Sequence, residues 1–163
     1  MTDPMLQALA DRAAITELLH GYCRALDAMD LDAIPALFTG DCVVSYGPRL
    51  ESRGARQLAA DLARLWRWRR TSHHLSNVTV RIDRDRAEAE SYVIAWHEAP
   101  DGQTATLFGQ YHDRLLRTAE GWRIAERRQV MNGNDAGFKV AIHPLLRRPP
   151  PPGWTAPDMT GGS

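Results

Sequence analysis

The hydrophobic period of the sequence changes near residue 73, and this change constrains the fold more than any other feature. From His73 onward apolar and polar residues alternate in four stretches, at about 73–83, 86–98, 104–118 and 122–131. The segments between them are polar and contain Asp or Gly, which is typical of hairpin turns. This half of the chain is therefore predicted to form four long strands of an antiparallel sheet.

The first 70 residues follow a helical spacing instead. Asp3-Pro4 is typical of a helix start, and the apolar residues after it predict a first helix of about 25 residues that ends near Asp27. A short helix through residues 34–38, a strand over 42–46 and a third helix over 52–70 are expected next. Helices followed by long strands predict an α+β domain, in which helices pack on one face of a strongly curved antiparallel sheet and enclose a pocket.

The length of 163 residues favours a single domain, which we assign to residues 1–146, followed by a Pro- and Gly-rich tail at 147–163. Twenty basic and twenty acidic residues cancel, so the charge gives no sign of nucleic-acid or membrane binding. The N-terminus lacks the features of a secretion signal, and no apolar run reaches the roughly 18 residues that cross a bilayer. We expect a cytoplasmic protein.

Two cysteines, Cys23 and Cys42, lie in apolar patterns without the spacing of metal ligands or a redox pair. They are predicted to be buried thiols, because free cysteine is among the most buried residue types. Neither a metal site nor a bound cofactor is expected.

His73 and His74 stand side by side at the start of the first long strand. Neighbouring side chains of a strand point to opposite faces, so only one of the two can face the interior. Asp27 lies one turn beyond Tyr22 on an apolar helical stripe, where a buried carboxylate needs a donor. It either meets the inward histidine or simply caps the helix end. A His–Asp pair fixes the imidazole tautomer and leaves the other nitrogen as a base near neutral pH.

The second long strand indicates where space could lie. Its odd positions, from Ala87 to Ala95, are small and lead to His97, whereas its even positions include Tyr92 and Trp96. With the odd face inward, a hollow is expected with His97 at its end; burial of the even face is the alternative. Tyr46 and His97 could then donate hydrogen bonds to an oxygen that becomes negative or leaves.

A family resemblance rests on Ile15-Thr16-Glu17-Leu18-Leu19, Tyr22, Ala25-Leu26-Asp27, Asp30, Leu37-Phe38, Asp41, Thr71-Ser72-His73, Asn77 and Gly121-Trp122-Arg123-Ile124. This pattern covers about residues 8–131 and resembles the SnoaL-like branch of the NTF2-like superfamily. Within the branch it is similar to scytalone dehydratase, bile-acid 7α-dehydratase and hexachlorocyclohexane dehydrochlorinase, which use a His–Asp pair for elimination without a metal or cofactor. The sequence departs from scytalone dehydratase at Leu26, where that enzyme has a tyrosine.

The resemblance implies that His73, four residues before Asn77, is the catalytic histidine and that Asp27 is its partner. It also implies roles for Tyr46 and His97 beside the reacting atoms, and leaves His74 inert. The side chains expected to line the pocket are Tyr22, Leu26, Val44, Leu75, Asn77, Val93, Phe108 and either Arg127 or Arg128, since strand alternation allows only one of the two arginines.

The function expected from this set is a cofactor-independent lyase, of the dehydratase or hydratase type, that acts on a hydrophobic cyclic, steroid-like or polyketide-like small molecule. An isomerase or polyketide cyclase would use the same residues without a leaving group. A non-catalytic binding protein, or a small subunit of a ring-hydroxylating oxygenase, would need neither residue of the pair. The resemblance further implies a homodimer or homotrimer.

Overall fold

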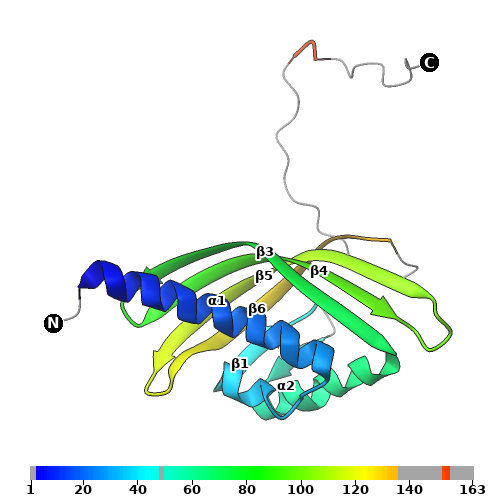
Figure 1. The fold of residues 1–163 in the computed structure, drawn as a ribbon, viewed down its shortest axis with the longest axis horizontal. Helices are drawn as coiled ribbons and strands as arrows, with labels where there is room; N and C mark the ends of the chain where they lie inside the picture. The colour runs from blue at the N-terminus through cyan, green and yellow to red at the C-terminus, as the bar shows by residue number, and fades with distance from the viewer. Residues whose placement is uncertain (1–2, 48–49, 136–151, 155–163) are drawn as a thin grey trace.

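The computed structural model describes residues 3–47, 50–135 and 152–154 (Figure 1). The predicted boundary at residue 146 and most of the predicted tail at 147–163 lie outside these residues. The elements in chain order are α1 (Pro4–Ala28), the 3-10 helix η1 (Ile34–Leu37), β1 (Phe38–Ser45), β2 (Glu51–Arg53), α2 (Ala55–Leu62), the 3-10 helix η2 (Ala63–Arg67), β3 (Arg70–Asp83), β4 (Arg86–Glu98), β5 (Thr104–Thr118) and β6 (Gly121–Asn134).

Helix α1 has the extent that the sequence predicts. The side chain of Asp3 accepts a hydrogen bond from the backbone N–H of Met5 at 2.8 Å, which caps the helix start. At the other end Met29 adopts a left-handed conformation with φ of 52°, which closes the last turn. The helix therefore ends at Ala28 and carries Asp27 in its final turn. None of the helices in the described part of the chain is long and apolar enough to cross a membrane.

The six strands form one curved sheet in the order β2-β1-β6-β5-β4-β3. The four long strands pair antiparallel with their neighbours in sequence, as predicted. Strand β1 instead lies parallel to β6, so the sheet is mixed rather than purely antiparallel. The helices cover one face of this sheet (Figure 1), which gives the expected α+β architecture.

The third predicted helix is largely replaced by other elements. Residues Glu51–Arg53 pair with β1 as the short strand β2, and the α-helix covers only Ala55–Leu62 before a 3-10 turn continues to Arg67. Gly54, with φ of 89°, separates the strand from the helix, a conformation that favours glycine. The apolar spacing of residues 52–70 correctly predicts the helix α2, but spacing alone does not show that Glu51–Arg53 pair with β1.

The odd positions of β4 face the helices, as expected. Ala87, Ala89, Ser91, Val93 and Ala95 are all buried, whereas Ile94 on the even face is exposed. The four apolar members of this set, Ala87, Ala89, Val93 and Ala95, belong to the same buried core cluster as Ile15, Leu19 and Tyr22 of α1.

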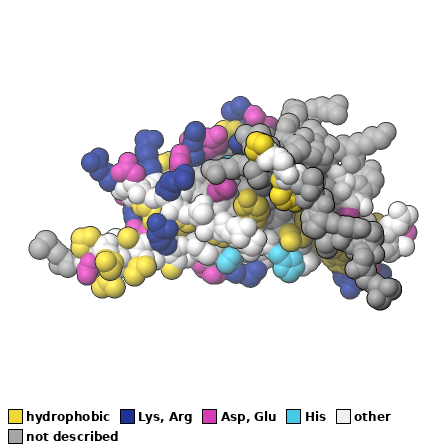
Figure 2. Space-filling model, turned by 90° about the horizontal axis from the view of Figure 1, so that it is seen from above, with side chains coloured by type: hydrophobic (Ala, Val, Ile, Leu, Met, Phe, Trp, Pro, Cys, Tyr) yellow, Lys and Arg dark blue, Asp and Glu magenta, His cyan; other side chains and the backbone are white. Residues whose placement is uncertain are grey.

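The exposed apolar residues of α1 gather at its N-terminal end. Met5, Leu6 and Leu9 are well exposed, and they form the hydrophobic group next to the N-terminus in Figure 2. Burial of the helix starts at Asp11 and becomes regular from Ile15 onward. The C-terminal half of α1 thus holds the helix on the sheet and positions Asp27.

Candidate active site

Asp27 and His73 are hydrogen-bonded, as the family resemblance implies. Nδ1 of His73 lies 2.6 Å from Oδ1 of Asp27, and the backbone N–H of His73 donates to Oδ2 at 2.9 Å. The hydroxyl of Thr71 donates to Oδ1 at 2.8 Å. The carboxylate is thus held by three donors from the start of β3, which fixes the end of α1 against that strand.

These contacts select the tautomer of neutral His73. A carboxylate can only accept, so Nδ1 of His73 carries the proton and Nε2 is left with a lone pair. Burial favours the neutral acid, but the hydrogen bonds from His73 and Thr71 outweigh it and hold the pKa of Asp27 below its ordinary value. The His73 side chain is only 5% exposed and that of Asp27 is 28% exposed, so the aspartate lies on the outer side of the pair.

A β-bulge makes His73 the inward histidine. Between Ser76 and Thr79 the pairing with β4 shifts, because Asn77 and Val78 together occupy the space of one residue. Asn77 has a positive φ of 51°, which asparagine tolerates better than most residues. Unbroken alternation from buried Val80 would have turned His74 inward, but His74 is exposed and contacts Ser72.

His97 lies beside the pair. Its ring centroid is 5.6 Å from that of His73 at an interplanar angle of 80°, and Trp68 covers it at 5.0 Å. Burial, together with the positive charge that His73 can carry, lowers the pKa of His97. His97 is therefore neutral near pH 7, where an imidazole N–H still donates a hydrogen bond.

A second polar cluster lies deeper in the core. Arg127 and Asp113 form a fully buried pair through two hydrogen bonds of 2.7 and 2.8 Å. The guanidinium stands 4.3 Å from the ring centroid of Tyr22 and 4.2 Å from that of Tyr111. Arg128 is exposed, so Arg127 is the inward arginine.

Tyr46 belongs to this second cluster. Its hydroxyl makes a short hydrogen bond with that of Tyr22, and Arg64 lies 5.0 Å from its ring centroid. Burial raises the pKa of both tyrosines. Within the described residues, no hydrogen bond joins Tyr46 to His73, so the four residues expected to act together fall into two neighbouring groups.

The expected lining residues are divided between interior and surface. Leu26, Val44 and Val93 are buried, and Leu75 is half-buried against the core. Phe108 does not line the interior: it pairs with Ile94 on the outer face of the sheet and is 38% exposed. Asn77 is also exposed, because the bulge removes it from the face that His73 occupies.

Sequence reasoning missed Thr71, Trp68 and Asp113. Thr71 stands two residues before His73 and therefore shares its face, a signal that the strand period contained. Asp113 alternates with buried Tyr111 and Leu115, and a buried acid of this kind needs a cation. No pattern in the sequence indicates that Trp68 contacts His97. The apolar spacing predicts a helix to residue 70, whereas the 3-10 helix η2 ends at Arg67, just before Trp68.

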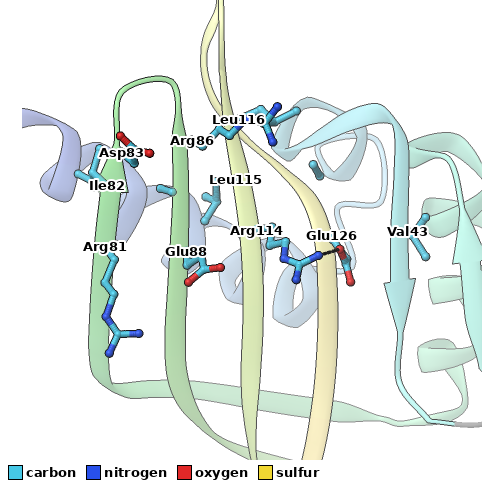
Figure 3. Close-up of a pocket in the computed structure, with 12 residues that line it drawn as sticks. Val43, Arg81, Ile82, Asp83, Arg86, Glu88, Arg114, Leu115, Leu116 and Glu126 are labelled. Carbon is cyan, nitrogen blue, oxygen red and sulfur yellow. Dashed lines mark hydrogen bonds and ion pairs between the residues drawn. The ribbon is translucent and has the colours of Figure 1, made fainter.

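A cavity of about 890 Å³ lies away from these groups, on the face of the sheet opposite the helices (Figure 3). Its lining comes from β1 and β3 to β6 and includes neither Asp27 nor His73. Across residues 3–47, 50–135 and 152–154, no group of three or more His, Cys, Asp or Glu side chains is arranged to hold a metal ion.

Comparison with known proteins identifies the family. Residues 7–128 match the family model of the SnoaL-like domain. The chain is 30% identical to the uncharacterized protein Rv2910c of Mycobacterium tuberculosis, over 73% of this chain and 84% of that protein.

Two crystal structures from Novosphingobium aromaticivorans are similar. A candidate scytalone dehydratase has a TM-score of 0.80 and 27% identity, over 87% of this chain and 97% of that one. A candidate aromatic ring hydroxylase has a TM-score of 0.70 and 28% identity, over 74% and 88% of the two chains. With the family match over residues 7–128, these findings show that the chain belongs to the SnoaL-like family of the NTF2-like superfamily.

Proposed function

We propose that this protein is a cofactor-independent lyase in which His73 is the base and Asp27 its partner. The observation that carries the proposal is the carboxylate of Asp27, held by Thr71 and by both the ring and the backbone of His73. This arrangement fixes the tautomer in which Nε2 can accept a proton, and the carboxylate stabilises the imidazolium that forms. A base of this kind accelerates proton removal by roughly 10²- to 10⁴-fold.

The reaction is an elimination. Nε2 of His73 takes a proton from a carbon next to a carbonyl group, and the electron pair of the broken C–H bond forms an enolate. The enolate re-forms the carbonyl and a carbon–carbon double bond as the hydroxyl on the adjacent carbon leaves, and that hydroxyl takes the proton from the His73 imidazolium to depart as water, which restores neutral His73. Neutral His97, next to His73, hydrogen-bonds the oxygen on which charge develops.

The second cluster supplies polar support to the same reaction. Tyr46, hydrogen-bonded to Tyr22, presents a phenol, and Arg127 presents a buried cation over the Tyr22 ring. The apolar side chains of Leu26, Val44, Leu75 and Val93 favour a hydrophobic substrate, such as a cyclic, steroid-like or polyketide-like carbonyl compound. The likeness to a candidate scytalone dehydratase supports the same class of reaction.

The test is turnover of a panel of β-hydroxy carbonyl, steroid and polyketide compounds, with water loss followed by mass spectrometry. His73→Ala and Asp27→Asn are each expected to lower kcat by at least about 100-fold. His74→Ala is the matched control, because the adjacent histidine is exposed on the other face. Equal activity of all three variants would refute the proposal.

Three alternatives have distinct outcomes in this assay. An isomerase or polyketide cyclase would need both residues of the pair but would release no water. A small subunit of a ring-hydroxylating oxygenase, favoured by the likeness to a candidate aromatic ring hydroxylase, would show no turnover and would co-purify with a larger oxygenase subunit. A small-molecule-binding protein would bind members of the panel without converting them.

A further inference from the structure

Four arginines stand close together in the chain where η2 leads into β3. They are Arg64, Arg67, Arg69 and Arg70, and no acidic residue occurs between Asp61 and Asp83. We call these four arginines the basic rim. The chain as a whole carries no net charge, so the basic rim is a local excess of positive charge, and the proposed elimination does not use it.

The basic rim divides into two pairs with different partners. Arg69 and Arg70 share the carboxylate of Glu98, which Arg69 approaches to 3.7 Å and Arg70 binds through a short hydrogen bond. In the part of the chain that the structure describes, neither Arg64 nor Arg67 forms an ion pair; they donate to backbone carbonyls at 2.8 and 3.1 Å. A guanidinium has five N–H donors, so most of those on this second pair can serve an acceptor that comes from solution.

Arg64 and Arg67 share one side of η2. Side chains three residues apart eclipse each other in a 3-10 helix, and Nε of Arg67 donates to the backbone carbonyl of Arg64. The guanidinium of Arg64 lies over the ring of Tyr46, 5.0 Å from its centroid. This side of η2 therefore borders the cluster of the candidate site that contains Tyr46.

The end of the same segment borders the catalytic pair. Trp68 directly follows η2, and its ring centroid lies 5.0 Å from that of His97, which in turn lies 5.6 Å from that of His73. Figure 1 shows η2 continuing into β3, the strand that carries His73. Residues 64–68 thus connect Tyr46 with His97, one from each of the two neighbouring groups of the site.

We propose that Arg64 and Arg67 bind an anionic group of the substrate, a carboxylate or a phosphate, while the apolar part of the substrate lies in the candidate site. Guanidinium groups bind both kinds of oxyanion through paired hydrogen bonds. Leu65 of the same helix packs against the core, and Trp66, which is 66% exposed, gives an apolar surface next to both cations. The inference rests on the proposed function in taking the ligand to be the substrate, and it adds that this substrate is an acid.

A small acid fits the basic rim better than a nucleic acid does. Binding to a nucleic acid depends on many cations that neutralise successive phosphates. Glu98 already contacts two of the four arginines, which leaves the single pair of Arg64 and Arg67. One pair of guanidiniums suits one oxyanion.

Isothermal titration calorimetry of the full chain with three probes tests the inference. The probes are 2-naphthoate, 2-naphthyl phosphate and methyl 2-naphthoate, which share one apolar ring system and differ in charge. At least one of the two anions is expected to bind at least about tenfold more tightly than the neutral ester. The anion that binds more tightly shows which acid group the site takes.

Methionine substitutions remove the charges and keep an apolar stem. Arg64→Met/Arg67→Met is expected to weaken binding of the anion at least about tenfold and to leave binding of the ester unchanged. Arg67→Met alone, which keeps the contact of Arg64 with Tyr46, should weaken it at least about threefold. Arg56→Met, at an exposed position of α2, is the matched control and should bind all three probes as the unmodified chain does.

The inference is overturned if neither anion binds, if the ester binds as tightly as the anions, or if the folded double variant keeps full affinity for them. A single-stranded oligonucleotide that binds where neither anion does would likewise overturn it. Circular dichroism verifies folding of each variant. Because binding is measured without turnover, tight anion binding by a chain that eliminates no water would refute the lyase and leave this inference standing.

Discussion

Asp11 fastens the N-terminal half of α1 to the hairpin of β5 and β6, and its replacement should cost measurable stability. Arg117 donates two hydrogen bonds to its carboxylate, at 2.7 and 2.6 Å, and Nε1 of Trp122 donates a third at 3.1 Å. The carboxyl is nearly buried, with 5% of the residue exposed. The charge of Arg117 and the three hydrogen bonds therefore stabilise an Asp11 carboxylate that has little contact with water.

The magnitude follows from the ionisation of Asp11. The hydrogen bonds from Arg117 lower its pKa from the ordinary 3.8 to about 2, against the opposing effect of burial. One pKa unit corresponds to about 1.4 kcal/mol, so the fall from 3.8 to about 2 contributes at most about 2.5 kcal/mol at neutral pH. Asp11→Asn is expected to lose about this amount, because the amide keeps the shape of the side chain without its charge.

The sign of the pH dependence is set by the lowered pKa. The folded protein holds the Asp11 proton less tightly than the unfolded chain, so the contribution is complete above about pH 5 and is lost as the pH falls through the folded pKa near 2. At pH 3 about half of it, roughly 1 kcal/mol, is left. The difference between the unmodified protein and Asp11→Asn should therefore shrink by half between pH 7 and pH 3.

Urea denaturation at pH 7 and pH 3 measures this difference. Asp85→Asn is the matched control, because Asp85 binds the same Arg117 at 3.1 Å but is 78% exposed. An exposed pair of this kind contributes less than about 1 kcal/mol. A stabilising role for the Asp11 charge is contradicted if Asp11→Asn lowers the free energy of unfolding no more than Asp85→Asn does, or if it lowers it equally at pH 7 and pH 3.

Two further predictions concern the core and the bulge. Arg127→Met should destabilise the protein by about 3–5 kcal/mol in urea denaturation, because it leaves the charge of Asp113 buried and unpaired. The double variant Arg127→Met/Asp113→Leu removes both charges and should recover most of the lost stability. A double variant as unstable as Arg127→Met would contradict this account. Asn77→Val should lower the free energy of unfolding by about 1–2 kcal/mol, since a β-branched residue disfavours the positive φ at this position. Asn77→Gly should leave the melting temperature nearly unchanged. Equal melting temperatures for the two variants would exclude backbone strain at the bulge.

Much of the fold was predictable because it depends on contacts that are local in sequence. The start of α1 at Asp3 and Pro4, and the three hairpins from β3 to β6, follow from capping, from turn residues and from the period of two. The parallel pairing of β1 with β6 was not predictable, because it joins segments about 80 residues apart and depends on the closed shape of the sheet.

The reactive side chains of the site could be named from the amino-acid sequence: a carboxylate in the last turn of a helix, two histidines at the start of a strand and, through the family resemblance, His73 as the inward one. The physical reason why His73 and not His74 faces inward lies in the tertiary structure. The bulge at Asn77 shifts the alternation of β3 by one residue, and a shift of one residue exchanges the two faces of a strand. The structure likewise decided that Tyr46 joins Tyr22 and that Arg127 pairs with Asp113, because partners from distant strands meet only when the whole sheet has formed.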